Sequence, residues 1–246
     1  MNSNVESTVP ATPEPAPPPF SFAVLLADAL RFLSFRPPSP ALLRHWPESL
    51  GFGLVVTWLA GIGRYWDNPR AELWQLAGLG SVAYVLVLSS LLWLLIAPLR
   101  PKHWSFRNVL LFVTLTSPPA LLYAIPVERF LDMNSAARVN AWFLAIVALW
   151  RVALYANFLR RVARLALFPA VVATVLPLAL IIVVLAMLNL EHVVFSIMSG
   201  ISPSDVSAND SAYQIVVITA SLSILASPVL LLAYLGSIYH ARLGRW

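Results

Sequence analysis

Residues 104–130 read WSFRNVLLFVTLTSPPALLYAIPVERF, and this stretch decides the fold. It opens with basic and aromatic residues, continues as an apolar run over 109–116, and meets Ser117-Pro118-Pro119 near its middle. About 20 apolar residues are enough for a helix to cross the hydrocarbon core of a bilayer. Each proline removes a helical hydrogen bond and clashes with the preceding turn. The stretch therefore predicts a membrane-crossing helix that is broken near its middle.

The composition also indicates a membrane protein. Hydrophobic residues make up 59% of the chain and charged residues 11%, whereas soluble domains have about 45–50% and about 25%. The net charge is +5, but the basic residues lie in short clusters between apolar segments. Nucleic acid is therefore not expected as a partner, because the chain lacks the basic stripe that such binding needs. The absence of cysteine excludes disulfides, a thiolate nucleophile and cysteine metal sites.

The first 45 residues divide into a tail and a short helix. Residues 1–19 are polar and rich in proline, a composition that predicts a disordered tail. Between Phe20 and Phe35, apolar residues recur at three- and four-residue steps, but the stretch is too short to span. It predicts an amphipathic helix that lies in the membrane interface, with Arg36 and Arg44 facing an acidic leaflet. Prolines then form a connector that ends near residue 45.

Residues 46–246 are expected to form a transmembrane domain of packed helices, so the fold class is an all-α polytopic bundle. Six apolar segments have nearly the length needed to cross. They lie near 49–65, 75–97, 106–126, 138–158, 166–189 and 213–239. The first is short and rich in glycine, which permits close helix contact but weakens insertion. Five spans is therefore the alternative count.

The distribution of basic residues predicts the orientation. Most of the 16 lysines and arginines lie in the N-terminal region, the second and fourth loops and the C-terminal end. An even number of spans places all of these clusters on one side, and Lys and Arg concentrate on the cytoplasmic side. Both termini are therefore predicted to be cytoplasmic.

Arg151 is the ionisable residue that the pattern places inside a span. A charge at a helix centre costs about 2.5–3.5 kcal/mol on insertion scales, so such residues are functional candidates. In that interpretation an anionic lipid headgroup or an anionic solute binds to Arg151, and Ser117, Pro118 and Asn140 are the other candidate contact residues. The alternative is structural: Arg151 snorkels toward the cytoplasmic headgroups, or bonds to backbone carbonyls that a proline elsewhere has freed.

Prolines are predicted to break three of the spans, and such breaks are a second functional candidate. They are Pro118 and Pro119 in the third segment, Pro169 and Pro177 in the fifth, and Pro228 in the sixth. Broken helices expose their ends to substrates in transporters. Kinks are also ordinary in membrane helices, where neighbours satisfy the freed groups. A small transporter or channel for an anionic solute is therefore the alternative function.

The last segment carries small residues at four-residue steps, namely Thr219, Ser223 and Ser227. Small residues at this step let another helix approach closely. They predict helix packing, either within the bundle or between two copies in a homodimer.

No catalytic or metal signature is present in the sequence. The four histidines have no ligand spacing, and neither a G-x-S-x-G elbow, an H-E-x-x-H helix nor a phosphate-binding glycine loop occurs. We therefore expect no enzymatic activity, no catalytic residues, no metal site and no cofactor.

The middle of the chain resembles the Yip1-domain membrane proteins, in particular their small prokaryotic relatives. The likeness covers roughly residues 50–190 and consists of a run of features. These are Tyr84 to Leu99, Trp104 to Asn108, the central Ser117-Pro118, the entry Asn140 to Trp142, and a basic turn into a proline-bearing span. The family usually has about five spans. The resemblance implies a polytopic helical protein of a bacterial inner membrane that acts without enzymatic activity, by organising or assisting membrane protein or lipid partners.

Overall fold

The computed structural model describes residues 20–37, 39–66, 72–188 and 211–244, and all regular elements in these ranges are helices. The α-helices are α1 Phe22–Leu33, α2 Pro40–Arg44, α3 Trp46–Gly63, α4 Leu73–Leu76, α5 Leu79–Ile96, α6 Phe106–Leu115, α7 Met133–Arg161, α8 Leu167–Met187 and α10 Ser211–Arg242. Three 3₁₀ helices complete the set: η1 Ala97–Leu99, η2 Pro118–Ala124 and η3 Val127–Arg129. The all-α prediction is confirmed for these residues, and the tail 1–19 lies outside them.

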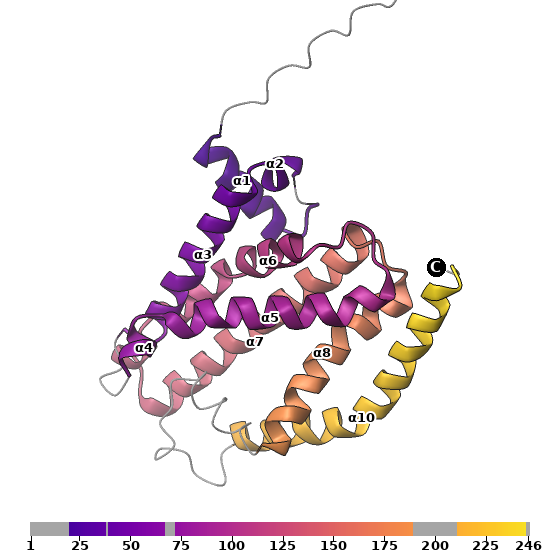
Figure 1. Cartoon of the computed structure of the whole chain (residues 1–246). Coiled ribbons are helices and arrows are strands. Elements are labelled where there is room, and N and C mark those ends of the chain that lie inside the picture. Colours follow the sequence, from indigo (N-terminus) through magenta and orange to yellow (C-terminus); the bar gives the residue numbers. More distant parts are fainter. Residues whose placement is uncertain (1–19, 38, 67–71, 189–210, 245–246) are drawn as a thin grey trace, which may run out of the picture.

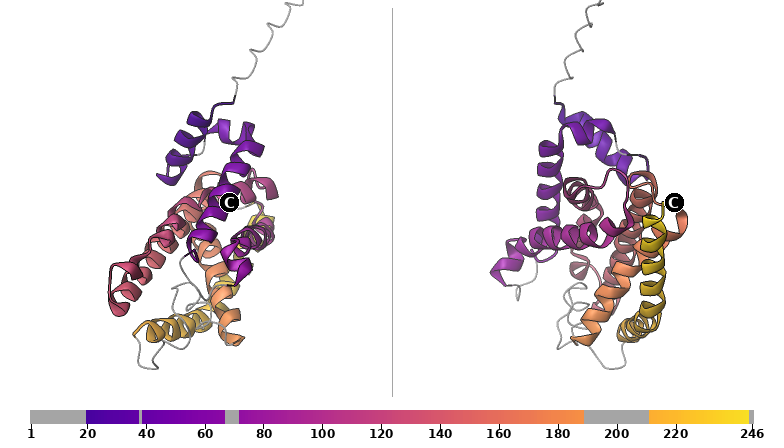
Figure 2. Two further views of the ribbon diagram at one scale, coloured as in Figure 1. Left: turned by 90° about the vertical axis from the view of Figure 1, so that its left-hand side faces the viewer. Right: turned by 45° about the vertical axis from the view of Figure 1, so that its right-hand side comes forward.

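The helices pack as one bundle with an N-terminal attachment. Helix α6 lies between α3 and α5, α7 contacts η2 and α8, and α8 runs beside α10 (Figures 1 and 2). Helices α1 and α2 lie at the end of the bundle where α3 begins (Figure 1). The buried side chains of α1, α2 and α5 to α8 form one continuous hydrophobic core.

Among the described residues, four helical segments have the length and apolar composition needed to cross a membrane: Leu79–Leu99, Arg138–Arg161, Leu167–Met187 and Val217–Arg242. The count of six spans is therefore not confirmed. Two of the predicted spans lack either the length or the apolar composition that a crossing helix needs. Helix α3 opens with Trp46-Pro47-Glu48-Ser49, which dilutes its apolar character, and α6 ends after 10 residues.

The break in the third segment is confirmed. Helix α6 ends at Leu115 and the 3₁₀ helix η2 starts at Pro118. The predicted breaks in the fifth and sixth segments are wrong, because α8 continues through Pro177 and α10 through Pro228. Pro169 lies in the first turn of α8, where a backbone N–H has no helical partner anyway. Helix α10 is bent along its length (Figure 1), as expected of an interior proline.

Helix α1 buries one face and exposes the other, and both faces carry large apolar residues. Its inner face, formed by Leu25, Ala29, Phe32 and Leu33, is buried in the core of the bundle. Its outer face exposes Phe22, Leu26 and Leu30. Two side chains of α7 hold its C-terminal end: Trp150 Nε1 donates to the Leu33 carbonyl at 3.0 Å, and Asn157 Nδ2 to the Phe35 carbonyl at 3.3 Å. The predicted interfacial helix is thus also part of the bundle.

Candidate functional site

The break after α6 leaves a backbone carbonyl without its helical donor. Two consecutive prolines supply no N–H, so the Ser117 N–H turns to the Thr114 carbonyl at 3.1 Å. The Ala120 N–H, which would serve the Thr116 carbonyl in a continuous helix, donates to the Ser117 carbonyl at 2.8 Å. The Thr116 carbonyl therefore needs a donor from elsewhere in the fold.

Arg151 of α7 provides that donor. Its Nε donates to the Thr116 carbonyl at 3.0 Å, and its Nη2 lies 3.4 Å from the Ser117 hydroxyl. A guanidinium suits this position because it stays charged and offers five N–H groups in a fixed plane. The contact with the Thr116 carbonyl is of the kind that the structural interpretation describes, in which Arg151 bonds to a freed backbone carbonyl.

A close contact between α3 and α6 fixes the same region from the other side. The Thr57 hydroxyl lies 2.6 Å from the Ser117 hydroxyl and 2.7 Å from the Gly53 carbonyl, and both threonine and serine are buried. One turn earlier, a Cβ added to Gly53 would lie only 2.6 Å from the Thr114 Cβ. The glycine therefore sets how closely the two helices approach, as the glycine-rich first segment predicts.

Two arginines and two tyrosines gather beside the break and are called here the arginine–tyrosine cluster: Arg64, Tyr84, Tyr123 and Arg151. The Arg64 guanidinium carbon lies 4.5 Å from the centre of the Tyr123 ring, and that of Arg151 lies 5.9 Å from the centre of the Tyr84 ring. The charges of both arginines act on the Tyr123 hydroxyl. Four different elements contribute to the cluster: the C-terminal end of α3, then α5, η2 and α7.

Arg151 and Ser117 of the predicted site are thus in contact, but the other predicted residues are placed differently. Pro118 opens η2 and is partly exposed. Asn140 lies on α7 eleven residues before Arg151, which at a rise of 1.5 Å per residue is about 16 Å along the helix. The structure therefore does not gather Asn140 with the break.

The three small residues of α10 differ in their exposure. Ser223 is buried and Ser227 partly buried, whereas Thr219 is exposed. Helix α8 is the main neighbour of α10. The burial of Ser223 is compatible with helix packing inside the bundle, and the packing role of the three residues stays a prediction.

The sequence pattern does not single out Arg64, Thr57, Tyr84 or Tyr123 as site residues. Only Thr57 had a usable signal, because it stands one helical turn after Gly53 on the glycine-rich helix. The other three lie near helix ends or loops, where aromatic and basic residues are also expected as interface anchors.

Within residues 20–37, 39–66, 72–188 and 211–244, no group of three or more His, Cys, Asp or Glu side chains is arranged to hold a metal ion. No protein-family model matches the chain, and neither a curated protein nor a solved structure matches it.

Proposed function

We propose that this chain is an integral membrane protein that acts without enzymatic activity, through contacts with membrane lipids and membrane protein partners. In this proposal it crosses the bilayer six times, with both termini cytoplasmic, and belongs to a bacterial inner membrane. The resemblance to the Yip1-domain proteins is the source of the bacterial assignment.

The observation that carries the proposal is how little of the long apolar helices the fold covers. In the apolar window of α10, only 11% of the residues are buried inside the bundle. Its outward side chains include Leu222, Leu225, Val229 and Leu232, all largely exposed. Water is a poor solvent for such a surface, so lipid or another membrane protein has to cover it.

The directions of the helices support six crossings. Helix α3 runs parallel to α6 and η2, because Thr57 meets Ser117 and Gly63 faces Ala124. Helix α7 runs the opposite way, since Arg151 meets Thr116 while the later residue Phe158 stacks on Phe112. Alternating directions are what successive crossings require. In this arrangement α3 is one crossing, and α6 with η2 is another.

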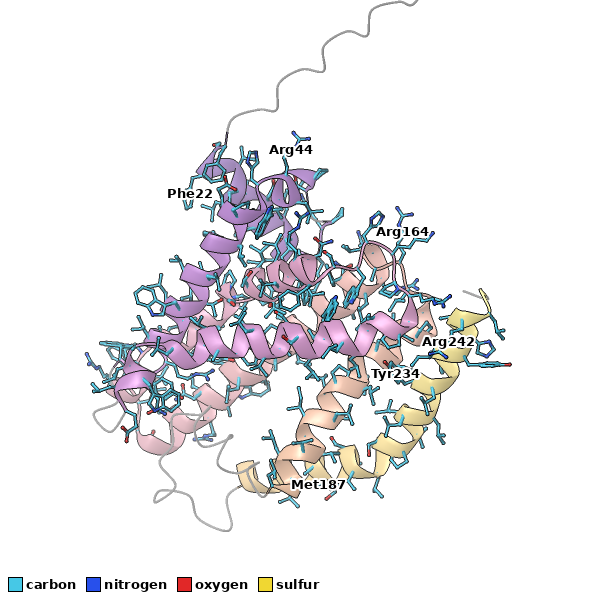
Figure 3. All side chains as sticks on the ribbon, in the orientation of Figure 1. Phe22, Arg44, Arg164, Met187, Tyr234 and Arg242 are labelled. Carbon is cyan, nitrogen blue, oxygen red and sulfur yellow. The ribbon has the colours of Figure 1, made fainter. Side chains whose placement is uncertain are left out.

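The ends of the helices support the orientation. Arg44, Arg164 and Arg242 lie toward the same end of the bundle, away from Met187 (Figure 3). A concentration of basic residues is typical of the cytoplasmic side.

The absence of cysteine allows a direct test of the topology. Single cysteines placed at Arg44, Trp66, Arg164 and Leu243 in the full chain are labelled in intact cells with a membrane-impermeant maleimide. Six crossings predict labelling at position 66 and protection at the other three. Labelling at position 44 or 243 contradicts the proposed orientation.

Partners are tested with the full chain extracted into nanodiscs and analysed by native mass spectrometry. A lipid or protein bound in constant ratio supports the proposal. A chain that carries neither, in nanodiscs of bacterial lipid extract, contradicts it. Deleting residues 1–19 then shows whether the tail contributes to partner binding.

A second candidate function is transport of an anionic solute past the broken helix. It is favoured by one observation, the two positive charges of Arg64 and Arg151 beside the break. The tight contact between Gly53 and Thr114 means that α3 and α6 have to separate before a solute can pass between them. Uptake of a radiolabelled anion into proteoliposomes, lost in Arg64→Gln, supports this candidate, and equal flux in protein-free vesicles contradicts it.

A further inference from the structure

We propose that the arginine–tyrosine cluster binds the phosphate group of an anionic ligand. Arg64 and Arg151 supply the positive charge, and the Tyr123 hydroxyl supplies a further hydrogen-bond donor. The inference rests on the proposed function, because it assigns to one site the lipid contact that the function requires.

The cluster has a net positive charge. Neither arginine forms an ion pair with a carboxylate of the described residues; each lies instead over a tyrosine ring. Both guanidinium groups are partly buried in a bundle with a largely apolar interior. Unpaired charges in such surroundings are costly, and a bound anion removes this cost.

The cluster also offers hydrogen-bond donors to an anion. Of the five N–H groups of Arg151, the Nε–H serves the Thr116 carbonyl and one on Nη2 faces Ser117. Within the described part of the chain, Nη1 has no hydrogen-bond acceptor. The Arg64 guanidinium lies over the Tyr123 ring and acts on its hydroxyl. Planar guanidinium groups with free N–H edges are the usual protein ligands of phosphate oxygens.

Arg151 is held in a fixed position. Its contacts with Thr116 and Ser117 hold the guanidinium beside the break, and α7 carries it on a continuous helix. A donor that is already held in place loses little conformational entropy when a ligand binds. The two contacts to the break therefore do not compete with anion binding but prepare for it.

The cluster is also accessible. Tyr84 is 46% exposed, and Arg64 and Tyr123 are partly exposed. Helix α3 begins beside α2 and ends just before Arg64, so the cluster lies toward the end of the bundle away from α1 (Figures 1 and 2). In the proposed orientation this is the non-cytoplasmic side. A phospholipid headgroup or inorganic phosphate can reach it from there.

The test uses Arg64→Gln, which removes one charge of the cluster and leaves the break with its Arg151 contacts. Arg129→Gln is the matched control, because Arg129 also lies over an aromatic ring, 4.7 Å from the centre of Trp66, but is not part of the cluster. Helical circular dichroism and a monodisperse elution profile establish that both variants fold.

In the lipid arm, the three full-length proteins are placed in phosphatidylcholine nanodiscs that contain about one-fifth phosphatidylglycerol, and native mass spectrometry counts the retained anionic lipids. In the phosphate arm, delipidated protein in detergent is titrated with inorganic phosphate, and the rise of the melting temperature gives an apparent Kd. Loss of one charge-assisted hydrogen bond weakens binding about tenfold or more. We expect this loss in Arg64→Gln and no change in Arg129→Gln.

The outcomes separate the site from the general function. Loss in the lipid arm assigns the site to a phospholipid, and loss in the phosphate arm alone assigns it to a soluble anion; both support the cluster. Equal retention of anionic lipid together with an equal phosphate response in wild type and Arg64→Gln overturns the cluster and leaves the proposed function standing. Protein that carries no lipid or protein partner and does not respond to phosphate overturns both.

Discussion

Replacing Gly53 by alanine is expected to separate α3 from α6. The new Cβ would lie 2.6 Å from both the Cβ and the hydroxyl oxygen of Thr114. Carbon atoms in contact prefer about 3.5–4.0 Å, so the two helices have to move apart by about 1 Å. The Thr114 side chain cannot turn aside at its Cβ, because that atom is fixed to the backbone of α6.

The magnitude follows from two terms. Overpacking of a well-packed interior costs about 1–3 kcal/mol. A displacement of this size also breaks the 2.6 Å hydrogen bond between Thr57 and Ser117, one turn further along α3. A neutral hydrogen bond contributes about 0.5–1.5 kcal/mol. Together the two terms amount to about 2–4 kcal/mol in the free energy of unfolding.

Gly51→Ala is the matched control. Gly51 lies on the same helix, and a Cβ there meets nothing within 4 Å. Alanine stabilises a helix relative to glycine by up to about 1 kcal/mol, and this gain is common to both variants. The difference between Gly53→Ala and Gly51→Ala therefore isolates the contact with α6.

The assay is unfolding of the purified protein in mixed micelles with increasing sodium dodecyl sulfate, followed by circular dichroism. We expect Gly53→Ala to be less stable than Gly51→Ala by about 2–4 kcal/mol. Thr114→Gly, which removes the opposing Cβ, is expected to couple favourably with Gly53→Ala in a double-mutant cycle. Equal stability of the two alanine variants would refute the close approach of α3 and α6.

Three further predictions concern other contacts of the fold. Arg151→Ala is expected to lower the stability by about 1–3 kcal/mol without preventing insertion, because it leaves a buried carbonyl unpaired; Arg129→Ala, an exposed arginine, should stay near wild type in the same assay. Trp150→Phe removes the hydrogen bond to the Leu33 carbonyl, so amide hydrogen exchange in α1, measured by mass spectrometry, should become about two- to tenfold faster. Unchanged exchange would show that this hydrogen bond does not stabilise α1. The Ser105 hydroxyl caps α6 by accepting from the Asn108 backbone N–H at 3.2 Å. Ser105→Ala removes this cap and should lower the melting temperature by an amount equivalent to about 0.5–2 kcal/mol. Ser105→Asp should retain most of the stability.

The parts of the fold that depend on local chemistry could be predicted from the sequence. Apolar runs of the right length locate the long helices to within a few residues, and two adjacent prolines locate the break after Leu115. The same local rule failed for Pro177 and Pro228, since a single proline in a long apolar helix bends it without ending it.

Contacts between residues far apart in the sequence could not be predicted. The pattern indicates that Arg151 is unusual and that a carbonyl near Pro118 lacks a donor, yet nothing local pairs Arg151 with Thr116, which is 35 residues away. The docking of α1 was missed for the same reason. An apolar face that fits a membrane interface fits a helix bundle equally well, because both surroundings exclude water.

Helix α1 is synthesised well before α7, the helix whose side chains hydrogen-bond to its C-terminal end. Leu33 and its partner Trp150 are separated by 117 residues. At a synthesis rate of about 5–20 residues per second, the first helix waits on the order of 6–23 s for its partner. During that interval α1 lacks its hydrogen bonds from α7, although Phe22 and Phe32 pack on Phe52 and Phe112 once α3 and α6 have been made. The outward-facing side chains of Phe22, Leu26 and Leu30 therefore hold α1 at the membrane surface until α7 has been synthesised.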